Sequence, residues 1–174
     1  MITEHSVLRG IIGAGLLLFA LVCRSASTEQ ADSAGVIYQL YKEFGWVALF
    51  APDPKADHYL GAEITDQPEP VLRHYFDKEL SRLIVKEAAC LRQHQGELCN
   101  LEFEPLYGSQ DPAAEELRIL PHAPDQVWVE YTYPATRAKI TIQYRLRHTA
   151  QGWRITDIVY PNANQLSLKA LLSR

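Results

Sequence analysis

The spacing of hydrophobic residues predicts helices in the first half of the chain. Apolar residues recur every three or four positions over residues 34–50 and again over 77–95, which is the period of an amphipathic helix. A shorter helix is expected at 70–75, after a proline-punctuated loop over 51–69. Asp77 precedes the longer helix and is placed to cap its first turn.

In the second half of the chain the pattern changes to alternation of apolar and polar residues. The alternation covers residues 126–134, 138–148 and 153–160, and a turn at 150–152 joins the last two of these strands. Residues 165–172 return to helical spacing. Helices followed by adjacent strands with one polar face predict an α+β fold, in which amino-terminal helices pack on a curved antiparallel sheet.

An apolar run precedes this predicted domain. Residues 11–22 contain only Gly, Ala, Leu, Ile, Phe and Val, with Arg9 before them and small residues at 25–27 after them. That order is typical of a secretory signal peptide, and twelve apolar residues fall short of the about 20 that a spanning helix needs. We therefore expect residues 1–25 to be a signal peptide.

Two alternatives to an ordinary cleaved signal peptide remain open: an uncleaved membrane anchor formed by residues 11–22, and a lipoprotein modified at Cys23. Membrane contact is expected only in these two cases. In all three cases the bulk of the protein is periplasmic or otherwise extracytoplasmic. Residues 26–33 are small and polar and are expected to form a flexible leader, which leaves 34–174 as a single domain.

Composition narrows the classes of function. The chain has 174 residues, of which 47% are hydrophobic and 22% charged, as in ordinary soluble globular proteins. Lys and Arg number 17 against 21 for Asp and Glu, which gives a net charge of -4. A general nucleic-acid binder needs a basic face, and the sequence has no basic run. We therefore expect no nucleic-acid partner.

Cys90 and Cys99 are the two cysteines that remain after cleavage, and in an oxidising compartment such a pair predicts a disulfide. Nine residues of continuous helix rise about 13.5 Å, which is too far for that bond, so the chain must turn back, and Gly96 is placed to allow the turn. Two buried free thiols are the alternative. The histidines share no metal-ligand spacing, so we expect no metal site and no cofactor.

Three segments resemble a bacterial family known as domain of unknown function 3828. They are the runs LEFEPLYGSQDP at 101–112, GWRITDIVYP at 152–161 and SLKALL at 167–172. The resemblance implies an envelope protein with a signal peptide and a cone-shaped fold similar to nuclear transport factor 2 and cystatin. Glu102 and Glu104 depart from the family pattern, which has Asp there. The family has no established activity, although some related small envelope proteins are accessory or immunity proteins.

Familiar catalytic motifs are absent, so no catalytic residue is assigned. Alternation predicts that Asp157 points inward together with Trp153 and Ile155, where a carboxylate must be hydrogen-bonded or shift its pKa. Asp157 is therefore either a structural brace or a functional group. The candidate ligand-binding residues are Asp157, Tyr131, Tyr144, Trp153, Gln110 and Asp111.

The sequence favours a non-catalytic protein-binding module, of accessory or immunity type, whose partner is another envelope or secreted protein. One alternative is a carrier that holds a small ligand in the cone cavity. Another is an acid–base enzyme centred on Asp157, with Tyr131 or Tyr144 as its phenol partner.

The predicted disulfide gives a first test. Closing a ten-residue loop stabilises a fold by about 2.5–3 kcal/mol in the chain-entropy model. We expect Cys90→Ser to lower the midpoint of thermal unfolding by several degrees. An unchanged midpoint, with both thiols of the native protein open to titration, would refute the bridge.

Overall fold

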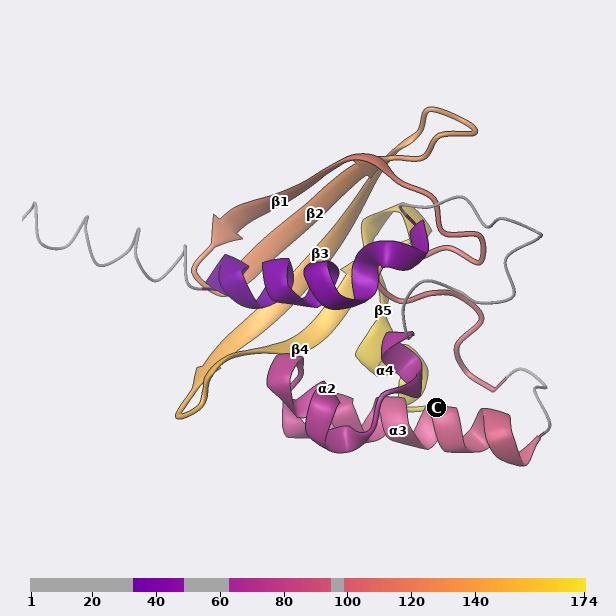
Figure 1. The fold of residues 1–174 in the computed structure, drawn as a ribbon, viewed down its shortest axis with the longest axis vertical. Helices are drawn as coiled ribbons and strands as arrows, with labels where there is room; N and C mark the ends of the chain where they lie inside the picture. The colour runs from indigo at the N-terminus through magenta and orange to yellow at the C-terminus, as the bar shows by residue number, and fades with distance from the viewer. Residues whose placement is uncertain (1–32, 49–62, 95–98) are drawn as a thin grey trace, which may run out of the picture.

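The computed structural model describes residues 33–48, 63–94 and 99–174, which form an α+β fold with an open five-stranded antiparallel sheet (Figure 1). The sheet has the order β1-β2-β3-β4-β5. The helical elements are a first helix over 33–44, η1 (Gly45–Ala48), η2 (Ile64–Asp66), α2 (Glu69–Tyr75), α3 (Lys78–Gln93), η3 (Pro161–Ala163) and α4 (Leu168–Leu172). The strands are β1 (Glu115–Ala123), β2 (Gln126–Thr132), β3 (Lys139–Thr149), β4 (Gly152–Tyr160) and β5 (Leu166–Ser167).

The predicted helices form close to their expected bounds. Asp77 caps α3, since its carboxylate accepts a hydrogen bond from the backbone N–H of Leu80 at 2.9 Å. Pro70 stands in the first turn of α2, where its missing N–H costs nothing. The first helix ends earlier than the expected residue 50 and tightens into the 3₁₀ turn of η1. The expected signal peptide, most of the leader and most of the proline-rich loop lie outside the described residues.

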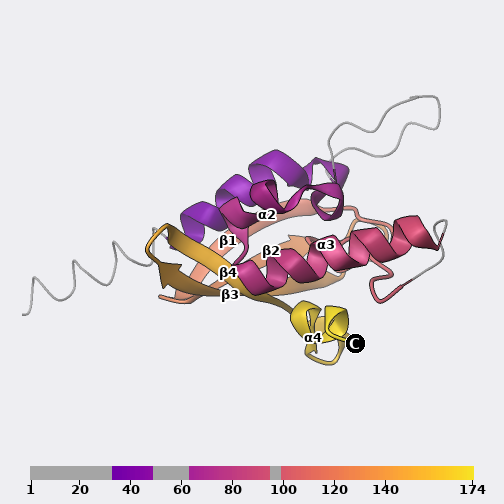
Figure 2. The same ribbon diagram turned by 90° about the horizontal axis from the view of Figure 1, so that it is seen from below.

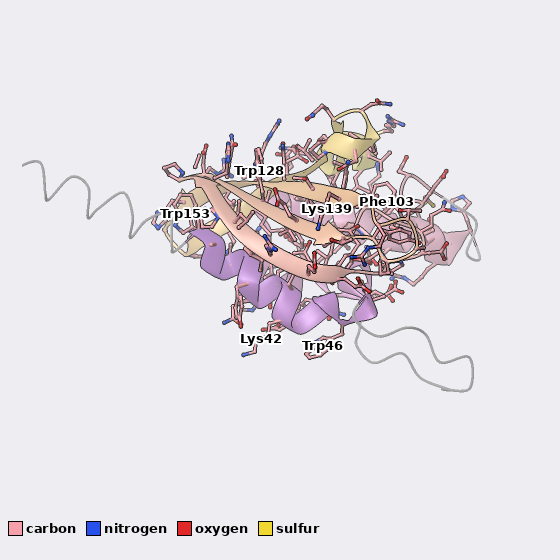
Figure 3. The ribbon with its side chains drawn as sticks, turned by 90° about the horizontal axis from the view of Figure 1, so that it is seen from above. Lys42, Trp46, Phe103, Trp128, Lys139 and Trp153 are labelled. Carbon is pink, nitrogen blue, oxygen red and sulfur yellow. A yellow bond between two sulfur atoms is a disulfide. The ribbon has the colours of Figure 1, made fainter. Side chains whose placement is uncertain are left out.

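Two layers enclose the core. The first helix, α2 and α3 pack on one side of the sheet. Helix α4 follows β5 at the edge of the sheet, where it contacts both α3 and β4 (Figure 2). Apolar residues of β2 and β3 fill the space beneath the helices, among them Val127, Val129, Ile142 and Tyr144, all 0–1% exposed. On the opposite side of the first helix, Lys42 and Trp46 project away from the sheet (Figure 3).

Strand β1 was not among the predicted elements. Most of its side chains are exposed, because it is the outer strand of the sheet, so its sequence shows no clean alternation. Pro121 stands within the strand, opposite Val127, and proline is tolerated only at such an edge. Glu116 has a φ of 55°, next to a shift in register between Glu115 and Arg118.

A β-bulge in β4 overturns the predicted orientation of Asp157. Leu146 pairs with Ile155 but Arg145 pairs with Asp157, so one extra residue of β4 lies between these two pairs. Opposed residues share a face of the sheet, and Arg145 is exposed whereas Leu146 is buried. Asp157 therefore lies on the face opposite to Ile155 and Trp153. A simple period of two cannot reveal such an insertion.

The carboxy-terminal helix is shorter than the expected range of 165–172. Leu166 and Ser167 pair with β4 as strand β5, and α4 begins only at Leu168. Ser167 joins both elements, because its hydroxyl also accepts the backbone N–H of Ala170 at 3.1 Å and so caps α4.

Three phenol hydroxyls hold residues 105–107 against the sheet. Tyr160 donates to the carbonyl of Pro105 at 2.8 Å, Tyr41 to that of Leu106, and Tyr131 to that of Tyr107 at 2.6 Å. The three tyrosines come from the first helix, β2 and β4, and each is at most 7% exposed. A loop with consecutive carbonyls bonded in this way joins the helical layer to the sheet.

The phenol cluster extends further through the core. Tyr144 donates to the hydroxyl oxygen of Tyr41 at 2.9 Å, because the proton of Tyr41 is already used by the loop. Tyr107 donates to the carbonyl of Gly45 at 2.5 Å, which ties the same loop to η1. Gly108 follows with a φ of 60°, and a Cβ there would come within 2.8 Å of the Tyr160 ring, so this position requires glycine.

The predicted disulfide between Cys90 and Cys99 is confirmed, with the two Cα atoms 6.3 Å apart. It joins the last turn of α3 to the segment that leads back toward the sheet. Gly96, which was expected to provide the turn, lies outside the described residues. A disulfide is typical of proteins in oxidising, extracytoplasmic compartments. Of the described helices, none has both the length and the apolar character that crossing a membrane requires.

The phenol cluster predicts the cost of removing one hydroxyl. We expect Tyr160→Phe to lower the free energy of unfolding by about 1–2 kcal/mol, because the buried carbonyl of Pro105 loses its donor. Tyr38→Phe is the matched control, since Tyr38 is 61% exposed. Urea unfolding that shows equal losses in the two variants would contradict the role given to the cluster.

Candidate functional site

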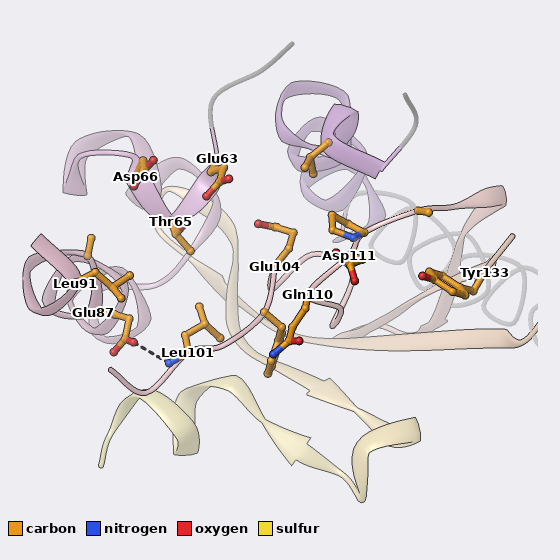
Figure 4. Close-up of a pocket in the computed structure, with 15 residues that line it drawn as sticks. Glu63, Thr65, Asp66, Glu87, Leu91, Leu101, Glu104, Gln110, Asp111 and Tyr133 are labelled. Carbon is orange, nitrogen blue, oxygen red and sulfur yellow. Dashed lines mark hydrogen bonds between the residues drawn. The ribbon is translucent and has the colours of Figure 1, made fainter. Parts of the chain in front are cut away.

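A cleft of about 430 Å³ opens between α3, η2, the end of η1 and the segment 101–113 (Figure 4). Its walls come from parts of the chain that are far apart in sequence. The apolar part of the lining consists mainly of Val47, Leu91, Leu101, Phe103, Pro112 and Tyr133. The polar part contains Thr65, Gln110 and the five carboxylates of Glu63, Asp66, Glu87, Glu104 and Asp111. Among the described lining residues there is no Lys, Arg or His.

Glu87 holds one wall of the cleft in place. Its carboxylate accepts the backbone N–H groups of Asn100 and Leu101, both at 2.7 Å, and the side-chain amide of Asn100 at 3.0 Å. The residue is only 3% exposed. Because its oxygens are satisfied by these donors, Glu87 is a structural clamp between α3 and the segment that follows Cys99.

Glu104 is the carboxylate whose ionisation is most perturbed. One oxygen accepts the backbone N–H of Leu106 at 3.1 Å, and the residue opens a tight turn that closes through its backbone bond with Ser109. The pKa of Glu104 is raised to about 7: burial is the main cause, the Leu106 N–H opposes it, and the nearby charge of Glu63 adds to the rise. Near neutral pH the protonated and the ionised form of this carboxyl group are therefore both populated.

The cleft thus combines negative charge with apolar surface. Phe103 is fixed by an edge-to-face contact with Tyr160, with ring centroids 5.0 Å apart, and so connects the cleft floor to the phenol cluster. A group that fits such a lining carries positive charge at its end and methylene groups along its length. The ammonium and guanidinium side chains of Lys and Arg have this form.

Two of the predicted ligand-binding residues, Gln110 and Asp111, lie in this cleft (Figure 4). Tyr131 and Tyr144 lie in the core, and their hydroxyls are used by Tyr107 and Tyr41. Burial raises the pKa of both phenols, that of Tyr131 to about 12. Their acidity is therefore low at physiological pH.

Asp157 and Trp153 lie away from the cleft. The carboxylate of Asp157 accepts the hydroxyl of Ser167 at 2.8 Å and the backbone N–H of Lys169 at 3.0 Å, which fixes the start of α4. Arg145 approaches it at 3.9 Å. Trp153 packs edge-to-face with His148. Since the sheet separates Asp157 from the inward-facing phenols, the acid–base set considered from the sequence is not assembled.

Sequence reasoning did not single out Glu63, Asp66 or Glu87, and it noted Glu104 only for its departure from a family pattern. One signal was available. Glu87 falls on the buried stripe of α3, between Ile84 and Leu91, where an apolar residue is expected. A charged residue in that position indicates a dedicated partner, which here is the backbone at 100–101.

Comparison with known proteins assigns no family. No protein-family model matches the chain, and a search of the curated proteins finds no match. Among solved structures, the phospholipid-binding protein from Ralstonia solanacearum, in complex with a phospholipid, aligns with a TM-score of 0.29 and 14% identity over 87% of this chain and 75% of that one. A likeness of this size establishes neither a common fold nor a common ligand. The resemblance to domain of unknown function 3828 stays a prediction.

The raised pKa of Glu104 predicts a pH-dependent stability. Because its folded pKa of about 7 exceeds the ordinary value of 4.5, the contribution of Glu104 to stability is fully present below about pH 4.5 and is lost as pH rises through 7. The isosteric Glu104→Gln variant lacks this loss. We expect equal unfolding free energies at pH 4.5 and an advantage for the variant of up to about 3 kcal/mol at pH 8.5. Glu102→Gln, on the exposed side of the same segment, is the control; parallel pH profiles for wild type and Glu104→Gln would contradict the assignment.

Proposed function

We propose that this protein is a non-catalytic binding protein of the bacterial envelope, and that its acidic cleft holds a Lys- or Arg-bearing segment of a partner protein. The observation that supports it is the lining of the cleft, in which carboxylates surround an apolar floor and no cationic side chain stands among the described residues. The partner is another envelope or secreted protein.

Both parts of a Lys or Arg side chain, the apolar stem and the charged head, match this lining. The methylene stem of Lys or Arg packs on Leu91, Leu101 and Phe103, while the charged head meets the carboxylates at the rim. The ring of Tyr133 offers a further contact for a cation. An arginine adds planar, two-pronged hydrogen bonds to a carboxylate, which favours it over lysine.

The net charge of the whole chain acts in the same direction. At -4 the protein attracts a basic partner from a distance, and salt weakens that attraction. The disulfide supports a place outside the cytoplasm. The proposal includes the finer fold expected from the sequence, a cone of the nuclear transport factor 2 type, and membership of the family called domain of unknown function 3828.

A small-ligand carrier is the second candidate, and the size of the cleft favours it. About 430 Å³ falls within the range of pockets that hold small molecules, roughly 300–1,000 Å³. The same lining would select an amine or guanidine with an aliphatic chain. The two functions therefore share one chemistry and differ in whether the cation is part of a protein.

Cross-linking in the native envelope, followed by mass spectrometry, separates them. We expect a cross-linked partner whose contact peptide contains Lys or Arg, and its recovery should fall at least about tenfold in the double variant Asp66→Asn with Asp111→Asn. The control is Glu102→Gln with Glu130→Gln, which changes the net charge equally but lies outside the cleft.

Raising the salt concentration should weaken binding to the wild type more than it weakens binding to the cleft double variant. Equal recovery with both double variants would contradict the role of the cleft. A chain that yields no cross-linked protein but retains an aliphatic amine on purification would favour the carrier.

A further inference from the structure

The end of α3 gathers three side chains that serve as ligands to soft metal ions. Cys90 lies in the last turn of α3, His94 ends the helix four residues later, and Cys99 is joined to Cys90. The sulfur and nitrogen atoms of the three residues all lie within 4.8 Å of one another. From this arrangement we propose that reduction of the Cys90–Cys99 disulfide creates a dithiolate–imidazole site for a thiophilic divalent cation such as Zn²⁺.

The spacing of Cys90 and His94 already suits a shared metal. The Sγ atom of Cys90 lies 3.5 Å from Nδ1 of His94. Two ligands of one tetrahedral zinc ion stand about 3.5–3.8 Å apart, given metal–ligand bonds of about 2.0–2.3 Å. The two sulfurs alone must separate. Their Cα atoms are 6.3 Å apart, which allows that separation by side-chain rotation.

Glu87 keeps the two cysteines adjacent when the disulfide is open. Its carboxylate binds the backbone N–H groups of Asn100 and Leu101, directly after Cys99, and it stands three residues before Cys90 on α3. The clamp is independent of the sulfurs and is buried. Reduction therefore leaves both thiols beside His94, so the ligands are held close together before the metal binds.

The chemistry balances with a small-molecule dithiol as the reductant. The dithiol passes two electrons to the protein disulfide, so the Cys90–Cys99 bond breaks, two protein thiols form and the dithiol becomes a disulfide. The cation then displaces one proton from each thiol. His94 must present Nδ1 without its proton, which means giving up the contact of that nitrogen with the carbonyl of Cys90 at 2.9 Å. His94 is exposed, so solvent supplies the fourth ligand.

Zn²⁺ binding to the full chain tests the proposal, with Cys23→Ser as background so that Cys90 and Cys99 supply all the thiols. Affinity is measured by competition with a chromophoric chelator, before and after reduction by a dithiol that is then removed without oxygen. We expect one Zn²⁺ per reduced chain and at least about tenfold weaker binding by the oxidised chain. Co²⁺ in place of Zn²⁺ should give thiolate-to-cobalt charge-transfer absorption.

Two variants assign the ligand. His94→Ala should weaken Zn²⁺ binding to the reduced chain at least about tenfold, whereas His74→Ala, an exposed histidine in the last turn of α2, should leave it unchanged. Equal affinity of His94→Ala and wild type would overturn the proposal. It would also be overturned if reduction abolished the near-ultraviolet circular dichroism of the packed tyrosines, because the Glu87 clamp would then not hold the site together.

Discussion

The fold depends on a set of hydrogen bonds from buried tyrosine hydroxyls to the backbone of one loop, residues 105–107. Residues 105–107 present three consecutive carbonyls to Tyr160, Tyr41 and Tyr131, which come from β4, the first helix and β2. A buried carbonyl without a donor is costly, so these bonds specify one position of the loop relative to both layers. Since the same loop continues into the wall of the cleft, the phenol cluster also determines where Phe103 and Glu104 stand.

A second attachment fixes the opposite wall. The disulfide and the carboxylate of Glu87 join α3 to residues 99–101 by one covalent bond and a set of hydrogen bonds. The segment that lines the cleft is therefore anchored twice, at residues 99–101 by α3 and at residues 105–107 by the tyrosine hydroxyls. Carboxylates that are already held in place lose little conformational freedom when a cation binds. Such a cleft can therefore recognise its ligand by complementary charge and does not need to bury a large area. The tyrosine hydroxyls in the core thus hold the fold together, whereas the carboxylates at the rim of the cleft are the groups that we propose bind the cation.

Periodicity predicted most of the fold because most of its elements have one buried face. The helical stripe of α3 and the alternation of β2, β3 and the first half of β4 all follow from that condition. The cap at Asp77 was predictable for a different reason, since its side chain accepts a backbone N–H of the first turn. Strand β1 was not predicted, since both of its faces are largely exposed. The orientation of Asp157 was wrong because the bulge at residues 155–157 is a property of strand pairing. Of the residues that line the cleft, only Gln110 and Asp111 were among the predicted ligand-binding residues. The remaining carboxylates come from separate segments of the chain, and no local spacing relates Glu63 to Glu104.

We propose that the cleft selects a cation with an aliphatic stem. The most direct measurement is a nuclear magnetic resonance titration of the full chain with butylguanidinium and, separately, with its neutral analogue butylurea. We expect saturable shifts of the backbone amides at 63–66 and 101–113 with butylguanidinium and none with butylurea. Equal responses to the two compounds, or shifts spread over the outer face of β1 and β2, would contradict it.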